Sequence, residues 1–256
     1  MSIKKILLIT QNEPIYIYDS ILSLLKELPN DWEITHSIIG NQNPTGKNLS
    51  FFEKVLRVLN TFGFIFFIQY SFLFIFSKLK NKNLKRLMKK NNVELIETPE
   101  GINHPDIYNK INNQDFDLAI SIAGTEIFKP KLFNLFKFGI INIHTSDLPK
   151  YRGLMPVFRA MQKGENKIGI SLFLVDEGID TGRILLKEYL DIKEKSMHQV
   201  IKQSKKIAVA IILNLLEDIE TKILLDLKNK NEKGSYFSFP NRRDILEFRD
   251  RGKRFF

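Results

Sequence analysis

The chain has 256 residues, 43 % of them hydrophobic, and its 39 Lys and Arg against 29 Asp and Glu give a formal charge of +10. This length and apolar content suffice to bury a large core, as one domain with an appendage or as two small domains. The chain has no cysteine, which excludes a disulfide framework, a thiol nucleophile and cysteine metal ligands; its four histidines lack a paired ligand spacing, so we expect a cytoplasmic protein without a metal.

Strands and helices are predicted to alternate along the first half of the chain. The apolar run in residues 1–10 is too short for a signal peptide and is interpreted as a first strand. Amphipathic spacing predicts a helix over residues 15–28, and β-rich runs predict strands over residues 32–39, 93–97 and 118–123. This alternation is typical of an α/β fold with an open, mainly parallel twisted sheet, helices on both faces, and ligands at the carboxyl ends of the strands.

An uncharged, phenylalanine-rich stretch interrupts this alternation. Residues 61–77 contain no charged side chain, and Lys54, Arg57, Lys78 and Lys80 flank them. The stretch is shorter than the roughly 20 apolar residues of a transmembrane helix and has polar residues in its middle. A buried helix of the sheet layer is the favoured interpretation, ahead of a homodimer interface and of a membrane-surface helix held by its basic flanks.

Polar residues stand on a further predicted strand, residues 139–144. Asn142 and His144 share one face of this strand, because side chains alternate between the faces. A polar pair on an otherwise apolar strand is either hydrogen-bonded for structural reasons or directed into a cleft.

An acidic, glycine-rich loop follows the next predicted strand, residues 168–175. Gly178 and Gly182 let the chain turn sharply, so that Asp180 can lie beside His144. A solvated loop is the alternative interpretation. A calcium loop is disfavoured, since the D-x-D-x-D-G spacing and the closing glutamate are missing.

Together the two segments resemble the folate-dependent formyltransferases, whose members share an N-x-H, L-P-x-Y-R-G, D-x-G-x-D-x-G series. The family includes glycinamide ribonucleotide, methionyl-tRNA and nucleotide-sugar formyltransferases. The resemblance covers about residues 120–189 and implies that Asn142, His144 and Asp180 are catalytic. Asp147 stands where many members carry leucine, which leaves the role of this position in shaping the pocket open.

The resemblance implies that a formyl group moves from 10-formyltetrahydrofolate to an amine. The amide of Asn142 can donate to the oxyanion that develops on the formyl carbonyl. His144 can donate to the same oxygen or move a proton, since histidine titrates close to neutral pH. Asp180 would either orient His144 or accept the proton through a water.

The resemblance also implies which loops hold the two ligands. We expect the folate to contact Ile122, Ala123, Gly124, Thr125, Glu126, Val175, Asp176, Gly178 and Ile179. We expect the acceptor to contact Tyr151, Arg152 and Gly153, because a guanidinium forks well onto phosphate oxygens. A structural pairing of Arg152 within its own turn is the alternative. The aromatic residues of 236–240 can stack on a base or close the core, and the core is favoured.

The predicted reaction is N-formylation of a nucleotide-linked amino-deoxysugar, such as a dTDP-4-amino-4,6-dideoxyhexose, for O-antigen or lipopolysaccharide synthesis. The run at residues 148–156 looks most like that of the sugar enzymes. We expect a catalytic domain over residues 1–190 and an extension over 191–256 that packs on it, with helices over 196–220 and from Arg242. The extension is too short for the barrel domain that methionyl-tRNA formyltransferases carry after their catalytic segment.

Other functions stay open. They are glycinamide ribonucleotide or methionyl-tRNA formylation, formyl-folate hydrolysis, and a non-catalytic binding or membrane-associated module, because fold does not fix function. The basic charge attracts anions. We expect small-molecule partners, a nucleotide sugar and a folate, rather than nucleic acid, and a homodimer, with membrane association less favoured.

Overall fold

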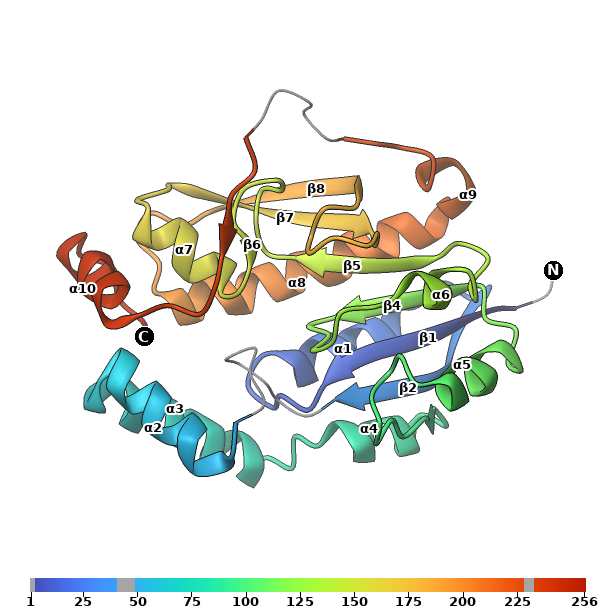
Figure 1. Cartoon of the computed structure of the whole chain (residues 1–256), viewed down its shortest axis with the longest axis horizontal. Helices are drawn as coiled ribbons and strands as arrows, with labels where there is room; N and C mark the ends of the chain where they lie inside the picture. Colours follow the sequence, from blue (N-terminus) through green and yellow to red (C-terminus); the bar gives the residue numbers. More distant parts are fainter. Residues whose placement is uncertain (1–2, 41–48, 228–232) are drawn as a thin grey trace.

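The computed structural model describes residues 3–40, 49–227 and 233–256. Its main sheet has seven strands in the order β3-β2-β1-β4-β5-β7-β8 (Figure 1). The strands are β1 (Lys4–Gln11), β2 (Trp32–Gly40), β3 (Glu94–Leu95), β4 (Leu118–Ile122), β5 (Ile140–His144), β7 (Lys167–Leu174) and β8 (Arg183–Asp191). The first five of these pair in parallel, whereas β7 is antiparallel to both β5 and β8. The mainly parallel α/β sheet expected from the sequence is confirmed.

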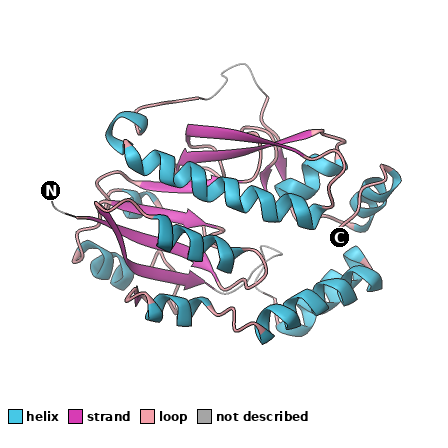
Figure 2. Cartoon of the chain, turned by 180° about the vertical axis from the view of Figure 1, so that it is seen from behind, coloured by secondary structure: helices cyan, strands magenta, loops and turns pink. Residues whose placement is uncertain are grey.

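Helices cover both faces of the sheet, and the strands alternate their side chains between them. One face carries α1 (Ile17–Glu27), α4 (Leu84–Lys90), α8 (Met197–Glu217) and the short α9 (Ile219–Lys222). The other face carries α5 (Pro105–Asn112) and α6 (Pro130–Phe133). In β1, Ile6 and Leu8 pack in the first layer, and Leu7 and Ile9 in the second. Seen from behind, the long α8 runs across the sheet beside α1 (Figure 2).

The predicted elements form with small changes at their ends. The described part of the first strand starts at Lys4, and residues 1–2 of the prediction lie outside the described residues. The first helix starts at Ile17, and the Glu13 carboxylate just before it accepts hydrogen bonds from the amides of Ile15, Tyr16 and Ile17, the last of which is the first free amide of the helix. The strand predicted over residues 93–97 pairs only over β3.

A second core lies beside the sheet and joins distant parts of the chain. It brings together α2 (Phe51–Phe62), α3 (Phe64–Leu79), α7 (Pro156–Gln162), α10 (Arg242–Asp250) and the C-terminal residues. A two-stranded parallel sheet of β6 (Arg152–Gly153) and β9 (Tyr236–Phe237) borders it. Stacked rings of Phe158, Phe248 and Phe255 form its centre, with centroids 4.6 to 6.3 Å apart.

An ion pair between α7 and α10 holds this second core together. The Arg159 guanidinium lies 2.8 Å from Oδ1 of Asp244, and it also donates to Gln162 and to the Ser238 carbonyl. The Arg159 and Asp244 side chains are 6 % and 18 % exposed. Replacing one partner of a buried pair leaves the other charge unpaired, which costs more than the loss of a surface pair.

We therefore expect Arg159→Ala to lower the free energy of unfolding by about 2 kcal/mol, below the full cost of a deeply buried pair because Asp244 keeps some solvent. Urea unfolding followed by circular dichroism measures this. Arg243→Ala is the matched control, because Arg243 pairs with Glu247 while 87 % exposed; its effect should stay below about 0.5 kcal/mol. Equal losses in the two variants would contradict a special role for Arg159.

The pair of Arg159 and Asp244 also makes the free energy of unfolding depend on pH. Burial alone raises the pKa of Asp244, but hydrogen bonds from Arg159, Asn241 and Gln162 outweigh it and hold that pKa below its ordinary value. A lowered folded-state pKa adds stability above the ordinary pKa of aspartate, and this stability is lost as pH falls through the folded-state value. Asp244→Asn should thus be less stable at neutral pH but lose less further stability on acidification. Parallel acid profiles for the two proteins would contradict this.

The phenylalanine-rich stretch is not buried in the sheet layer, so the favoured prediction was wrong. It forms α3 and the end of α2, which break at Gly63, where φ is 88°. Of the side chains of α3, Phe66 and Ser77 are buried, whereas Ile65, Phe72 and others are exposed. Hydropathy gives the amount of apolar surface on a helix but not which neighbour covers it. No helix in the described ranges is both long and apolar enough to cross a membrane.

Candidate active site

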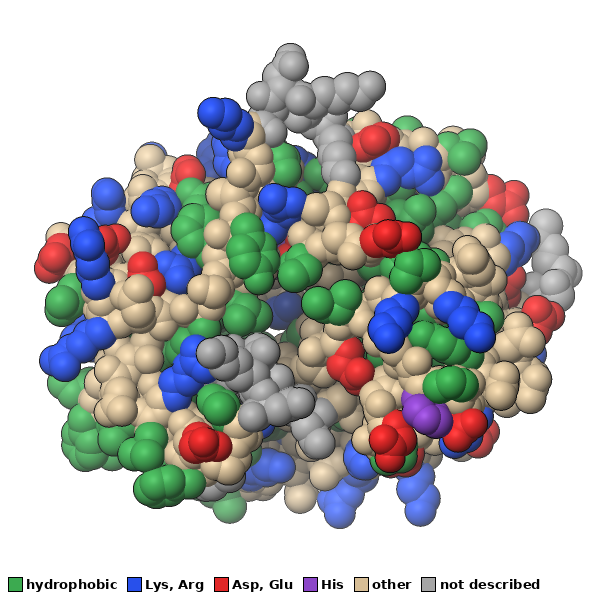
Figure 3. All heavy atoms as spheres, in the orientation of Figure 1, with side chains coloured by type: hydrophobic (Ala, Val, Ile, Leu, Met, Phe, Trp, Pro, Cys, Tyr) green, Lys and Arg blue, Asp and Glu red, His purple; other side chains and the backbone are tan. Residues whose placement is uncertain are grey.

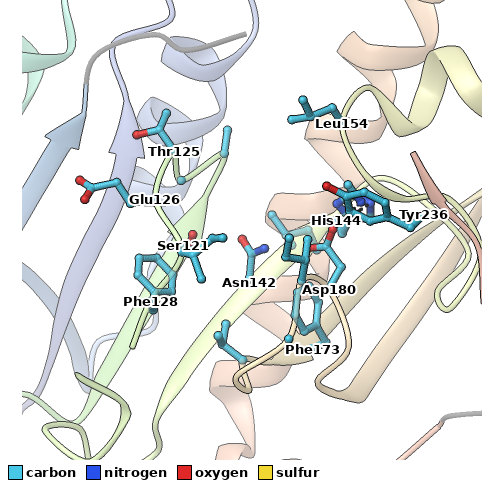
Figure 4. A pocket seen from close by; sticks show the side chains of 18 of the residues that line it. Ser121, Thr125, Glu126, Phe128, Asn142, His144, Leu154, Phe173, Asp180 and Tyr236 are labelled. Carbon is cyan, nitrogen blue, oxygen red and sulfur yellow. Dashed lines mark hydrogen bonds and ion pairs between the residues drawn. The ribbon is translucent and has the colours of Figure 1, made fainter. Parts of the chain in front are cut away.

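Asn142 and His144 lie on the same face of β5, as predicted. Ile141 and Ile143 point to the opposite face and pack in the layer of α8. The two polar side chains line a pocket of about 930 Å³ beyond the carboxyl end of β4 (Figure 4). Ligands of open α/β sheets commonly bind at this edge, where strand order changes direction.

The histidine is held by two neighbours. Nε2 of His144 lies 2.9 Å from the Tyr151 carbonyl, and because a carbonyl can only accept, Nε2 carries the hydrogen and donates. Oδ2 of Asp180 lies 3.7 Å from the same nitrogen, which is too long for a hydrogen bond but close enough for charge attraction to a protonated ring. The side chains of His144 and Asp180 are only 10 % and 13 % exposed.

Asp180 reaches this position from a strained loop. Its φ is 52°, a left-handed conformation that is uncommon outside glycine. Oδ2 of Asp180 also accepts a hydrogen bond of 2.8 Å from the Gly153 amide, which ties the loop to β6. Ala123, Tyr151 and Met155, in other loops of this region, have positive φ as well. Such conformations cluster at functional sites because the surrounding structure must hold them.

Gly182 closes the Asp180 loop against its own strand. A Cβ at this position would lie 1.8 Å from the Leu174 carbonyl oxygen, a backbone atom that cannot rotate away. We expect Gly182→Ala to lower stability by about 2 kcal/mol and to reduce activity by displacing Asp180. Thermal unfolding and steady-state kinetics test this, with the exposed Glu177→Ala in the same loop as control. A Gly182→Ala protein with unchanged activity would contradict it.

One end of the pocket contains the loops predicted to bind folate. Of the residues predicted there, Ala123, Gly124, Thr125, Glu126, Val175, Asp176, Gly178 and Ile179 line it. Ile122 does not: it is 1 % exposed and packs under α1 and α8. Phe128 and Phe173 also line this end and were not predicted. Their rings are distant in sequence, and nothing local distinguishes them from core phenylalanines.

The other end is lined by Gly153, Leu154, Tyr236, Ser238 and Phe239. Figure 4 shows Leu154 and Tyr236 on the same side of the pocket as His144. Of the three residues predicted to bind the acceptor, Gly153 lines the pocket and Tyr151 and Arg152 do not. The Tyr151 hydroxyl donates to Glu165 at 2.7 Å, and its ring stacks on Phe237. Burial, followed by the Glu165 hydrogen bond, raises the pKa of Tyr151 well above its ordinary value.

The pocket is also lined by a basic side chain that the sequence analysis did not identify as a site residue. Arg57 of α2 lines the pocket, and its guanidinium lies 4.7 Å from the centroid of the Phe239 ring. In the sequence it is one of several basic flanks of the apolar stretch. Tyr236 alternates with Phe237 along β9, so Tyr236 faces the pocket and remains 54 % exposed. Both residues come to line the same pocket as Asn142 only through the tertiary fold.

Asp147, which departs from the family series, serves the scaffold. Its carboxylate accepts from Nζ of Lys187 at 2.7 Å and from the hydroxyl of Tyr189 at 3.1 Å, both on β8. Lys187 also donates to the Leu148 carbonyl. Asp147 does not line the pocket. The carboxylate in place of leucine is therefore matched by a cation on the neighbouring strand.

No group of three or more His, Asp or Glu side chains in the described part of the chain is arranged to hold a metal ion. What converges on the centre of the pocket is instead an amide, an imidazole and a carboxylate. They combine hydrogen-bond donors with groups able to move a proton, which is the requirement of acyl transfer.

Residues 75–214 match the family model described as formyl transferase, and the chain belongs to this family, the folate-dependent formyltransferases. The fold is likewise the mainly parallel α/β fold of this family.

The chain is similar both to curated sequences and to solved structures of formyltransferases. The methionyl-tRNA formyltransferase of Finegoldia magna is 29 % identical over 156 residues, which cover 60 % of this chain and 50 % of that protein. The chain thus spans about half the length of the curated relatives it matches. Among solved structures, the Helicobacter canadensis N-formyltransferase in complex with folinic acid and dTDP-3-aminofucose has a TM-score of 0.59 at 20 % identity, covering 99 % of this chain and 80 % of that one. The phosphoribosylglycinamide formyltransferase of Streptococcus pneumoniae has a TM-score of 0.57 at 12 % identity, covering 85 % and 99 %.

Proposed function

We propose that the protein transfers the formyl group of 10-formyltetrahydrofolate to the amine of a nucleotide-linked amino-deoxysugar, such as a dTDP-4-amino-4,6-dideoxyhexose, for O-antigen or lipopolysaccharide synthesis. The observation that carries this proposal is the position of Asn142, His144 and Asp180 between two differently lined ends of one pocket. Its volume of about 930 Å³ is at the upper end for a single small ligand, so two ligands can meet at its centre.

The residues at the Ala123 end fit a folate. Val175 and the exposed Ile179 offer apolar surface to a flat ring, the largely buried Phe128 and Phe173 line the pocket beside them, and the backbone of residues 123–126 offers polar groups to the ring edge. When bound there, 10-formyltetrahydrofolate supplies an activated formyl carbon. Residues 1–190 then form the catalytic domain we propose, with residues 191–256 packed on it as an extension.

Three side chains act on the reacting atoms in this proposal. As the acceptor nitrogen bonds to the formyl carbon, the Asn142 amide donates to the carbonyl oxygen that becomes negative. His144 holds or moves the proton that the attacking amine gives up, and the charge of Asp180 stabilises the protonated ring. Collapse of the intermediate breaks the bond to the folate nitrogen, which takes up a proton.

The opposite end supports a nucleotide sugar as acceptor. Arg57 supplies a charge for a diphosphate, and the exposed ring of Tyr236 supplies a surface on which a base can stack. The ligands named for the Helicobacter canadensis structure are a folate and a dTDP amino sugar, and its fold covers almost the whole of this chain. The same two classes of ligand fit the two ends described here.

The test is to incubate the purified chain with 10-formyltetrahydrofolate and a panel of nucleotide amino sugars. Release of tetrahydrofolate together with the mass gain of one formyl group on a sugar nucleotide is the expected result. Tyr236→Ala should raise the KM for that acceptor more than the KM for the folate. Folate turnover with release of formate and no formylated sugar would indicate a hydrolase instead.

A second candidate acceptor is methionyl-tRNA, because the curated sequence relatives carry that name. Both candidates share the same catalytic centre and differ in the acceptor. Formylation of charged initiator tRNA, with every nucleotide sugar left unmodified, would favour the tRNA over the sugar.

A further inference from the structure

The outer surface of α2 and α3 is apolar although it faces solvent. We define this apolar face by its exposed side chains, which are Phe52, Leu56, Phe64, Ile65, Ile68, Phe72, Ile75, Phe76 and Leu79, between 39 % and 76 % exposed. Nine large side chains on two consecutive helices exceed the scattered apolar residues of an ordinary surface.

Two apolar stripes run along α3. Phe66 is buried and packs on Tyr70, Phe255 and Phe256, which fixes the inner stripe to the second core. The outer stripe repeats at helical spacing through Ile65, Ile68, Phe72, Ile75 and Leu79. A helix that is apolar all round is normally buried on all sides or in contact with lipid. The inner stripe already accounts for contact with the protein, so the outer stripe is left to a partner.

The face is held rigidly in place. Phe62 at the end of α2 stacks on Phe66 with centroids 4.6 Å apart, and the Phe62 carbonyl accepts a hydrogen bond from Arg249 of α10. The outer stripe is therefore presented in a fixed orientation.

Charge around the face is predominantly positive, and Glu53, whose carboxylate caps the start of α2, is the one acid of α2, α3 and α4. Residues 54–93 contain no Asp or Glu, whereas they contain Lys54, Arg57, Lys78, Lys80, Lys82, Lys85, Arg86, Lys89 and Lys90. The acids that pair with Lys82 and Lys85 are Asp19 and Glu97, outside this segment. Figure 3 shows hydrophobic side chains gathered over α2 and α3 at the lower left, with Lys and Arg side chains along the lower edge.

We propose that α2, α3 and α4 dock the protein onto the surface of an anionic phospholipid bilayer. The apolar face enters the boundary between head groups and acyl chains, and the basic residues beside it, other than the pocket-lining Arg57, contact lipid phosphates. The 16 residues of α3 span about 24 Å, less than the roughly 30 Å of a hydrocarbon core, so the helix lies in the plane of the membrane.

Charge separates this partner from a second copy of the chain. A symmetric dimer through the apolar face would bring two copies of α2, α3 and α4 together, and against the many cations of each copy these helices offer Glu53 as their one carboxylate. An anionic bilayer supplies both the apolar contact and the opposite charge. The proposal does not depend on which acceptor the pocket uses.

Vesicle flotation with the whole chain tests the docking. We expect the protein to float with vesicles of phosphatidylcholine containing about a third phosphatidylglycerol, and to bind vesicles of phosphatidylcholine alone at least about tenfold more weakly. Binding to the mixed vesicles should fall as salt rises, because salt screens exposed charges. A protein that stays at the bottom with the mixed vesicles, or that binds both kinds equally, would overturn the proposal.

Paired variants locate the surface. Ile65→Asp with Phe72→Asp should reduce binding by about tenfold or more, and Lys78→Glu with Lys80→Glu should do the same. The controls are Leu224→Asp with Leu246→Asp and Lys110→Glu with Lys206→Glu, which are exposed at other places and should leave binding unchanged. Circular dichroism and formyl transfer to a soluble acceptor verify that each variant is folded.

Light scattering after gel filtration tests the alternative partner, a second copy of the chain. If the native chain is a dimer, if Ile65→Asp with Phe72→Asp makes it a monomer, and if neither protein floats with vesicles, the apolar face joins two copies and the proposal is wrong. If the control variants lose vesicle binding to the same extent, the lipid-binding surface is not on α2 and α3 and the proposal is also wrong.

Discussion

Replacing Asn142 with Ala is expected to lower kcat by 100- to 1,000-fold, which corresponds to about 3 kcal/mol of lost transition-state stabilisation. The amide is directed into the centre of the pocket from β5, where a donor can meet the oxyanion of the formyl carbon. KM for both ligands should change much less, because the oxyanion exists only in the transition state. Steady-state kinetics with both substrates varied measures the two effects.

His144→Ala should reduce kcat by a similar factor. This change also leaves the Tyr151 carbonyl without its donor, so a small loss of stability, about 1 kcal/mol, is expected besides. His144→Gln separates the two effects, because its amide can restore a donor to Tyr151 but cannot move a proton. We expect a restored melting temperature with kcat still low.

Ser238→Ala provides the matched control for both replacements. Ser238 lines the same pocket but is given no part in the proposed reaction, so its alanine variant should keep kcat within about threefold. A His144→Ala enzyme with native kcat, measured while Ser238→Ala is also native, would contradict the catalytic assignment.

Local patterns predicted the strands and the centre of the site. Alternation on β5 placed Asn142 and His144 on one face, and the glycines after β7 let Asp180 turn back to within 3.7 Å of the His144 ring. These inferences depend on neighbours within a few residues of each other, where the period of a strand or the freedom of a glycine decides direction. The family series extended them to a reaction.

The rest of the pocket is set by tertiary packing, which the sequence does not display. Arg57 and Tyr236 are far apart in the chain and line the same pocket only because β9 pairs with β6 and Arg57 of α2 packs on Phe239, just after β9. Tyr151 and Arg152 belong to the family series, yet their side chains do not line the pocket, whereas the next residue, Gly153, does. Ile122 belongs to the predicted folate loop but is the last residue of β4, so its side chain alternates into the core.

Asp180→Asn is expected to lower kcat by roughly 100-fold while the loop keeps its shape. Asparagine matches aspartate in size, tolerates the left-handed backbone at this position, and can accept the hydrogen bond from the Gly153 amide through its side-chain oxygen. What it lacks is the negative charge 3.7 Å from Nε2 of His144. The predicted loss therefore isolates the electrostatic role of the carboxylate from its structural one.

Asp180→Ala removes both roles and should differ from Asp180→Asn in a specific way. Without an acceptor for the Gly153 amide, β6 loses its tie to the loop at the acceptor end of the pocket. We expect a higher KM for the acceptor in Asp180→Ala than in Asp180→Asn, with a similar fall in kcat. Equal acceptor KM values in the two variants would show that the Gly153 contact does not shape binding.

The combination of Asp180→Asn with His144→Ala decides between the two roles left open for the carboxylate. If Asp180 acts through His144, by orienting its ring and stabilising its protonated form, the double variant should be no slower than His144→Ala alone, because the group on which it acts is gone. If Asp180 instead accepts the amine proton through a water, the two losses should multiply. The 3.7 Å separation between Oδ2 and Nε2, with the Gly153 amide bound to the same oxygen, favours the first result.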